Sequence, residues 1–225
     1  GSELNTNIRA SVDEVNQLAN NIASMNGRLR DLSSASTGGA PNDLLDRRDL
    51  WLRELAGKMD IDVLPQADGS VDVFVGQGRS LVQGSAANKL STETIPGNSE
   101  QLQIIVDGVP PQALGALSGG ELQGLLGLRE RVLEPNQSRL GLLLLNLTSA
   151  FNAQHQQGLD LGGMPGEAFF KIPLIQVESN KVNTGTAVLG IEVEDAQQLD
   201  ASRYRVSWDG SAWTMTRLRD GASVS

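Results

Sequence analysis

Residues 15–32 read VNQLANNIASMNGRLRDL, and the spacing of the apolar side chains in this stretch decides the fold. Apolar residues recur there at intervals of three and four: Val15, Leu18, Ile22, Met25, Leu29 and Leu32. Such a heptad pattern buries one stripe of a helix against its neighbours and leaves the other faces in water. We therefore predict a long packed helix over residues 4–34, which the sequence GGAP at 38–41 ends.

The next stretch, PNDLLDRRDLWLREL at residues 41–55, allows two interpretations. Asp43, Asp46 and Asp49 have a constant spacing of three, which suits either a metal or acid–base site or the charged face of a helix. Arg47 and Arg53 follow the outer two carboxylates by four residues, the spacing at which opposite charges pair on a helix surface. We favour the charged helical face, because exposed carboxylates that pair with arginines usually keep ordinary pKa values.

The same residues predict where this second helix begins and how it packs. Asn42 is a good N-cap, because its side-chain oxygen can accept a hydrogen bond from the first free backbone N–H groups. Leu45, Leu52 and Leu55 form the apolar stripe, with Arg48 at the one polar position in that phase.

From residue 60 the apolar period changes from helical spacing to two. Valines and isoleucines occupy every second position at 61–63 and 71–75, on either side of the Asp-Gly turn at 67–70, which predicts a β-hairpin. Further strands are predicted at 79–83 and 102–107. Gly76-Gln77-Gly78 resembles part of a phosphate loop, but no Gly-Lys-Ser/Thr follows it, so a hairpin turn or bulge is favoured.

Helical spacing returns over residues 119–157. The seam of this third helix is Leu126, Leu133, Leu140, Leu143 and Leu147. Pro135 interrupts it and should kink or restart the helix, because proline has no N–H to donate. The LLLL run at 142–145 makes the helix apolar on more than one face, which predicts a second neighbour or a surface for a partner.

A second β-rich stretch follows at 169–225. Val188, Ile191 and Val193 predict one strand, and residues 204–208 and 213–215 predict a hairpin about Asp209-Gly210. A further Asp-Gly turn at 220–221 is followed by only four residues, so we expect the natural chain to continue with a partner strand. The opening Gly1-Ser2 is interpreted as a tag-cleavage scar, and any export signal would lie outside this fragment.

The composition excludes several classes of function. Eighteen basic against 27 acidic residues give a net charge of −9, which disfavours nucleic acid and anionic membranes as partners. Cysteine is absent, which excludes disulfides, Cys-based metal sites and a thiol nucleophile, and the single histidine excludes multi-histidine metal sites. No Gly-x-Ser-x-Gly nucleophile elbow occurs either, so we expect no metal site, no cofactor and no catalytic residue. The single histidine, His155, is interpreted as a structural residue near a helix end rather than a general base.

These patterns predict an α+β fold: a long-helix bundle or coiled-coil domain with a small β-hairpin module, followed by part of a mostly β outer domain. We expect the helical domain over residues 3–168, with its inserted hairpins at about 60–115. The outer β domain is expected over 169–225.

Several motifs, in order, resemble the flagellar hook–filament junction family (FlgK, the first hook-associated protein). NDLLDRRD at 42–49 is similar to that family's N-D-L-L-D-x-R-D stretch, and GGELQGLL at 119–126 and RERVL at 129–133 also match. Asn152, His155 and the Phe169-Phe170 pair fit the same pattern. The resemblance covers nearly residues 8–172 and is weaker in specificity beyond them.

The resemblance implies a bacterial structural protein that is secreted to the extracellular flagellum and polymerises between hook and filament. In that family the terminal helices pair and form the innermost tube, and neither is present here. The implied partners are copies of itself, the hook protein, the second junction protein and an export chaperone that binds the missing terminal region. The family supplies no catalytic residues. We expect a full-length chain to assemble and this fragment to stay monomeric.

Two other functions remain open from the sequence. One is a secreted coiled-coil effector or adhesin-like binding module, in which Trp208 or Trp213 would contact a ligand. The other is an enzyme with paired carboxylates in a cleft between the two domains.

Overall fold

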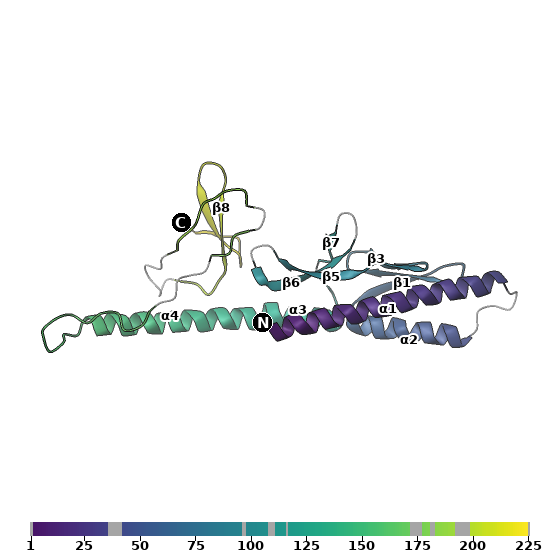
Figure 1. Ribbon diagram of the computed structural model, residues 1–225, viewed down its shortest axis with the longest axis horizontal. Coiled ribbons are helices and arrows are strands. Elements are labelled where there is room, and N and C mark those ends of the chain that lie inside the picture. The colour runs from purple at the N-terminus through teal and green to yellow at the C-terminus, as the bar shows by residue number, and fades with distance from the viewer. Residues whose placement is uncertain are drawn as a thin grey trace. The chain divides into compact units, whose positions relative to one another are not determined.

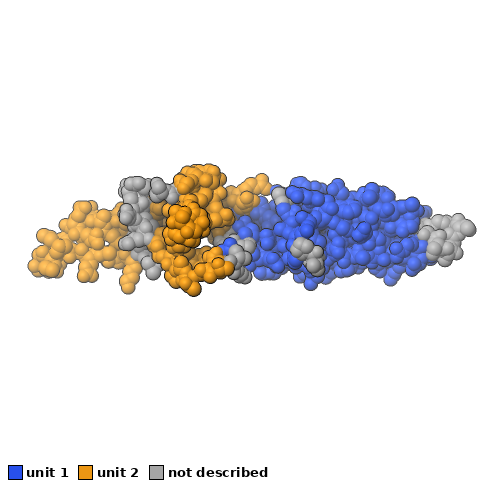
Figure 2. All heavy atoms as spheres, turned by 90° about the horizontal axis from the view of Figure 1, so that it is seen from above, with its two compact units in different colours: residues 1–129, 180–182 blue, residues 130–179, 183–225 orange. Residues whose placement is uncertain are grey.

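The structure is a computed structural model that describes residues 2–35, 42–95, 98–107, 111–115, 117–171, 177–180, 183–191 and 199–224. The chain divides into two compact units, residues 1–129 with 180–182 and residues 130–179 with 183–225 (Figure 2). Each unit is described by itself. Within the described residues, no helix combines the length and apolar character that crossing a membrane requires.

The first unit is built around one long helix, α1 (Ser2–Ala35), which is about 50 Å long at about 1.5 Å per residue. The second helix, α2 (Asn42–Lys58), lies beside α1, and strands lie over α1 (Figure 1). A third helix, α3 (Gly120–Leu128), contacts both α1 and α2. The predicted N-terminal helix is confirmed, and α2 begins at Asn42, the residue predicted as its N-cap. The GGAP break lies outside the described residues.

The strands of this unit form two antiparallel sheets. The first has the order β1-β2-β3-β4: Ile61–Pro65, Val71–Val75, Arg79–Gln83 and Ala86–Ala87. The second has the order β5-β6-β7: Leu90–Ile95, Asn98–Val106 and Gln112–Ala113. The predicted hairpin is confirmed by the pairing of Ile61 with Val75, and Gly69 takes the positive φ of 82° that its turn requires. The predicted strand at 102–107 is longer than expected, because β6 begins at Asn98.

The core of the first unit is formed by α1 and the faces packed against it. The largest fully buried apolar side chains on the helical side are Ile8, Val15, Ile22, Leu29, Leu55 and Leu122, with Met59 directly after α2. Val73, Val75, Leu81 and Leu90 contribute the strand side of the core. Aliphatic side chains fill this interior, in keeping with the low aromatic content of 4%.

The third predicted helix is confirmed, with an irregularity near Pro135. A π-helical turn over Arg129–Leu133 follows α3, and α4 (Glu134–Gln156) begins with Pro135 in its first turn. Proline is tolerated there because its missing N–H would have no helical partner. The sequence predicted either a kink or a restart of the helix at Pro135, and the structure shows a restart.

The second unit contains α4, a loop at 157–170 and a three-stranded antiparallel sheet of order β10-β9-β8. Its strands are β8 (Tyr204–Trp208), β9 (Trp213–Arg217) and β10 (Ser223–Val224). The hairpin about Asp209-Gly210 is confirmed, since Trp208 pairs with Trp213. The expected partner strand after Asp220-Gly221 is already present, because β10 pairs with β9.

The strand predicted from Val188, Ile191 and Val193 is wrong in its described part. Residues 183–191 form no strand, and Val193 lies outside the described residues. Val188 is almost fully exposed, so this alternation has no sheet neighbour to bury it. The overall α+β class is confirmed by the helices and sheets together.

Candidate functional site

The three aspartates at the start of α2 lie on the water-facing side of that helix. Asp43, Asp46 and Asp49 are all exposed, and no group of three metal-ligating side chains occurs among the described residues. The charged helical face is therefore the interpretation that the structure supports for this stretch.

The ion pairs on this face differ from the prediction. Within the described residues, Asp43 makes no ion pair with Arg47, and Arg53 donates from Nε to the backbone carbonyl of Asp49 at 3.2 Å rather than to its carboxylate. Arg48 instead pairs with Asp49 at 3.5 Å. The other nitrogen of Arg48 donates to the carbonyl of Gly69 at 2.8 Å, so the polar residue in the apolar phase ties α2 to the β1–β2 turn.

The predicted seam of α1 is buried except at its last residue, Leu32, which is 38% exposed. Val15, Ile22 and Leu29 are fully buried, Met25 is buried, and Leu18 is half-buried. The helix α1 contacts α2, α3 and both sheets, so it packs against several neighbours rather than against one partner helix.

The seam of the second helix is buried at one end only. Leu55 is fully buried, while Leu45 and Leu52 are half-buried.

The seam of the third helical stretch changes along its length. Leu126 and Leu133 are half-buried, but Leu140, Leu143 and Leu147 are 57%, 62% and 52% exposed. Within the described residues, this last part of the seam faces solvent, and it stays a predicted packing surface.

Asparagine side chains join α1 to the sheets, and sequence reasoning missed them. Asn26 is buried, accepts from the N–H of Val71 at 3.1 Å, and donates to the carbonyls of Val71 and Gly84 at 2.7 and 2.8 Å. Asn16 makes the same two-way contact with Leu90, at 2.7 and 2.8 Å. The available signal was an asparagine directly after a seam residue, Val15 or Met25, but polar residues in such places usually face water.

Lys58, at the end of α2, links three helices. Its Nζ lies 2.5 Å from Glu14 of α1 and 2.6 Å from Glu121 of α3. The hydrogen bonds to Glu121 and Glu14 raise the pKa of Lys58, so the lysine stays charged at neutral pH. The start of α3 lies very close to it, because a Cβ at Gly120 would be 2.5 Å from the nitrogen of Met59.

The end of α4 holds a loop through Asn152 and His155. Asn152 accepts from the N–H of Phe170 and donates to its carbonyl, both at 2.8 Å. The carbonyl of Glu167 lies 2.7 Å from Nδ1 of His155, and because a carbonyl can only accept, Nδ1 carries the proton. This geometry gives His155 a structural role, in agreement with the sequence interpretation.

The aromatic rings of this loop stack on α4. Phe170 packs edge-on against Phe151 with a centroid distance of 5.9 Å, and Phe169 lies 5.6 Å from the ring of His155. Gly166 allows the close approach, because a Cβ there would lie 2.8 Å from Nδ1 of His155. The phenylalanine pair that the sequence singled out is therefore part of the loop anchor.

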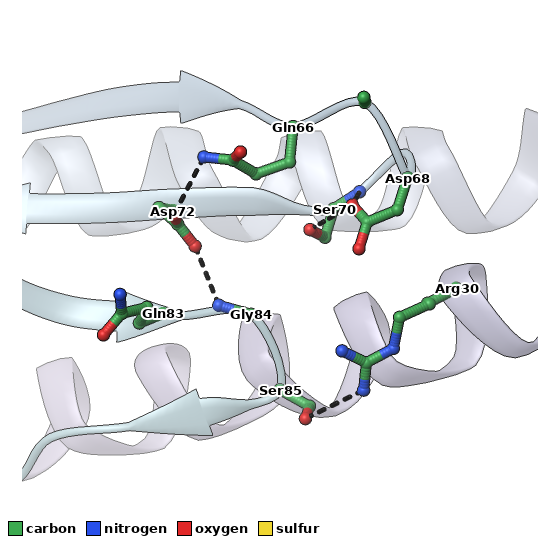
Figure 3. A pocket seen from close by; sticks show the side chains of 9 residues that line it. Arg30, Gln66, Asp68, Ser70, Asp72, Gln83, Gly84 and Ser85 are labelled. Carbon is green, nitrogen blue, oxygen red and sulfur yellow. Dashed lines mark hydrogen bonds between the residues drawn. The ribbon is translucent and has the colours of Figure 1, made fainter.

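A polar cleft of about 480 Å³ lies beside the β1–β2 turn, lined in part by Arg30, Asp68 and Asp72. Figure 3 shows Asp72 between Gln66, which donates at 2.8 Å, and the N–H of Gly84, which donates at 2.7 Å. Arg30 donates to Ser85 at 3.1 Å. Hydrogen bonds from the side chain and backbone of Ser70 hold the pKa of Asp68 below its usual value. These groups hold the turn and the strands together, so the cleft is a structural network.

Known proteins match the chain over its whole length. A family model described as the flagellar hook-associated protein FlgK helical domain matches residues 1–170. A second, described as a flagellar hook-associated protein 1, D2-like domain, matches residues 178–225.

Curated relatives and a solved structure agree with these models. Flagellar hook-associated protein 1 of Escherichia coli (strain K12) is 36% identical over 99% of this chain and 42% of its own length. The protein of the same name from Salmonella typhimurium is 34% identical over 99% of this chain and 41% of its own length. The structure of the flagellar hook junction protein FlgK from Burkholderia pseudomallei is 34% identical, with a TM-score of 0.86 over 100% of this chain and 41% of that one.

The helical unit and the matches along the chain define the class as flagellar hook-associated proteins. Within that class, the chain belongs to the FlgK family. It spans about two fifths of the length of the curated relatives it matches, at 42% and 41%.

Proposed function

We propose that this chain is part of a structural protein of the bacterial flagellum, which forms the junction between hook and filament by self-assembly of helical subunits. The observation that carries the proposal is the likeness over the whole chain to a solved hook junction protein, with a TM-score of 0.86 and 34% identity.

The mechanism is mechanical. The buried seam of α1 makes the first unit one rigid body, because each fully buried leucine or isoleucine contributes roughly 1.5–3 kcal/mol. Asn16, Asn26 and Lys58 fix the helices to each other and to the sheets by directional bonds. A subunit held in this way transmits force between its neighbours without changing its internal packing.

The exposed seam of α4 supplies a surface for assembly in this proposal. Leu140, Leu143 and Leu147 follow heptad spacing and remain largely exposed in the described structure. Exposed apolar stripes of this kind mark packing surfaces, because water is excluded from them when a second helix docks.

The proposed partners are copies of the same protein, the hook protein and the second junction protein, with an export chaperone that binds a terminal region outside this chain. The proposed location is the extracellular flagellum, and nucleic acid and membranes are not partners. We assign no catalytic step, because the exposed aspartates of α2 and the protonated Nδ1 of His155 support none. The helical shell domain is proposed at 3–168 and the outer β domain at 169–225.

Trp208 and Trp213 support a second candidate function, a ligand-binding module. Their rings lie 5.2 Å apart on the β8–β9 hairpin and are 52% and 51% exposed. Replacing both with alanine should leave assembly intact and abolish ligand capture if this candidate is correct.

Genetic complementation tests the junction proposal. The full-length gene should restore filaments and swimming to a strain that lacks its own copy. The Ile22→Asp variant should not, and the Ser24→Asp variant on the exposed side of α1 should restore both. A full-length protein that is exported but never restores filaments would contradict the proposal.

A further inference from the structure

A second polar cleft, of about 370 Å³, differs from the first because its arginine makes no side-chain hydrogen bond or ion pair among the described residues. Arg79 and Asp107 are among its lining residues, all of which lie within the first unit. In the first cleft, Arg30 and Asp72 are engaged by the chain's own groups. In the second, Arg79 makes no hydrogen bond or ion pair through its side chain within the part of the chain that the structure describes.

The position of Arg79 shields part of its side chain from water. Arg79 pairs with Val75 at the start of β3, so its side chain starts on the sheet face that also buries Val71 and Val73. Its Nε is shielded from water and unsatisfied. Burying one N–H donor without an acceptor is unfavourable, so this N–H calls for an acceptor, while the rest of the half-buried side chain stays accessible.

The chemistry of the cleft favours a carboxylate as that acceptor. The Nε and Nη donors of a guanidinium form a planar fork that matches the two oxygens of a carboxylate. Asp107 lines the same cleft, with its Oδ1 accepting from Ser91 at 2.5 Å, and its negative charge disfavours a dianion such as phosphate. A carboxylate, which carries one negative charge on two coplanar oxygens, therefore fits this cleft best.

We propose that this cleft receives a glutamate or aspartate side chain from a second copy of the protein, and that Arg79 binds it. This inference rests on the proposed self-assembly. The charge balance supports the same source, because the chain carries 27 acidic against 18 basic residues and a neighbouring copy therefore presents carboxylates in excess.

Association of the full-length protein tests the proposal by sedimentation velocity. Arg79→Gln should weaken self-association by at least about tenfold, because it removes the fork that binds the carboxylate. Arg47→Gln is the matched control: it removes the same charge from an exposed position of α2 and should stay within about twofold of wild type. Equal association of the two variants would overturn the proposal.

Two further measurements test whether the site binds a carboxylate and whether that carboxylate comes from a second copy or from the same chain. In the first, sodium formate is added to monomeric protein and the NMR resonance of the Arg79 Nε–H is followed, with sodium chloride at equal ionic strength as the control. Formate should shift this resonance until the site is saturated. No shift would overturn the anion site. A carboxylate from the same chain predicts instead that Arg79→Gln lowers the monomer's melting temperature and leaves association unchanged, which would overturn the second-copy source. Failure of the wild-type protein to associate would reject the proposed self-assembly, while the formate arm would still report on the site.

Discussion

Ile22 lies in the middle of α1 with a fully buried side chain, surrounded by the seam that joins the helix to its neighbours. We predict that Ile22→Asp unfolds the first unit, because a buried carboxylate without a partner is added to the loss of apolar packing, at a combined cost of roughly 4 kcal/mol or more. Leu18→Asp should cost less, since Leu18 is only half-buried. Circular dichroism melting measures both. A melting temperature for Ile22→Asp equal to that of the exposed control Ser24→Asp would refute the buried seam.

Asn26 gives a prediction about polar residues in the core. Replacing it with alanine leaves the N–H and carbonyl of Val71 and the carbonyl of Gly84 without their buried partner. We expect a loss of roughly 2–4 kcal/mol, since each unsatisfied buried group costs about 1–3 kcal/mol and water relieves part of this. Urea unfolding measures it. Asn20→Ala, at an exposed position of the same helix, should cost less than about 0.5 kcal/mol, and equal losses would contradict the assigned role of Asn26.

The residues that the sequence predicted best are the apolar ones with a period. Val15, Ile22 and Leu29 are buried as their spacing indicates, because a helix fixes which side chains share a face. Partners of polar side chains depend on the packing of distant elements instead. Arg48 was expected to be merely a polar residue in an apolar phase, and its bond to Gly69, 21 residues away, follows only from the position of the hairpin.

The loop at 157–170 is an element held by a few specific contacts. Gly166→Ala should release it from α4, because the new Cβ would lie within 2.8 Å of Nδ1 of His155 and displace the ring from Glu167. Limited proteolysis should then cleave this loop at least about tenfold faster, since opening becomes more frequent. Gly185→Ala is the control, because nothing lies near its Cβ. Equal cleavage rates would show that the anchor is unimportant.

The stability of the sheet of β8, β9 and β10 should fall at acidic pH, because carboxyl groups in its turns become protonated. The backbone N–H groups of Ala212 and Ser211 and the hydroxyl of Ser211 lower the pKa of Asp209, and Arg217 lowers the pKa of Asp220. A carboxyl whose folded pKa is below its unfolded value contributes stability above the unfolded value, about 3.9, and loses it as pH falls through the folded one. The sheet should therefore keep its stability above about pH 5 and weaken as pH falls below about 4.

Amide hydrogen–deuterium exchange of β8 and β9 measures this weakening, with Asp209→Asn as the comparison. The asparagine variant should show a flatter dependence on pH, because it cannot lose a charge at the turn. Equal slopes for wild type and variant would contradict the contribution of Asp209.

At the scale of elements, sequence patterns predicted the helices and hairpins that have strong local signals. The Asp-Gly turns at 68–69 and 209–210 each join two paired strands, because glycine supplies the positive φ that the turn needs. The strand expected from Val188 and Ile191 failed in the described part, because alternation alone does not provide a neighbouring strand. The restart at Pro135 was predictable, but the π-helical turn before it was not, since no local sequence rule specifies one.

At the scale of the whole molecule, the 225-residue chain should be monomeric at micromolar concentration, while the full-length protein should assemble. The chain spans 42% of the length of a curated relative, and the expectation rests on the paired terminal helices that the family resemblance implies outside this part. Analytical ultracentrifugation compares the two. Large closed rings formed by the 225-residue chain would contradict this expectation.

Localisation of the full-length protein in the flagellum is the most direct test of the central claim, that this chain serves as a junction subunit. Immunogold electron microscopy of isolated flagella, with an epitope on the full-length protein, should place the label at the boundary between hook and filament. Label spread along the filament, or found only on the cell surface, would contradict the account.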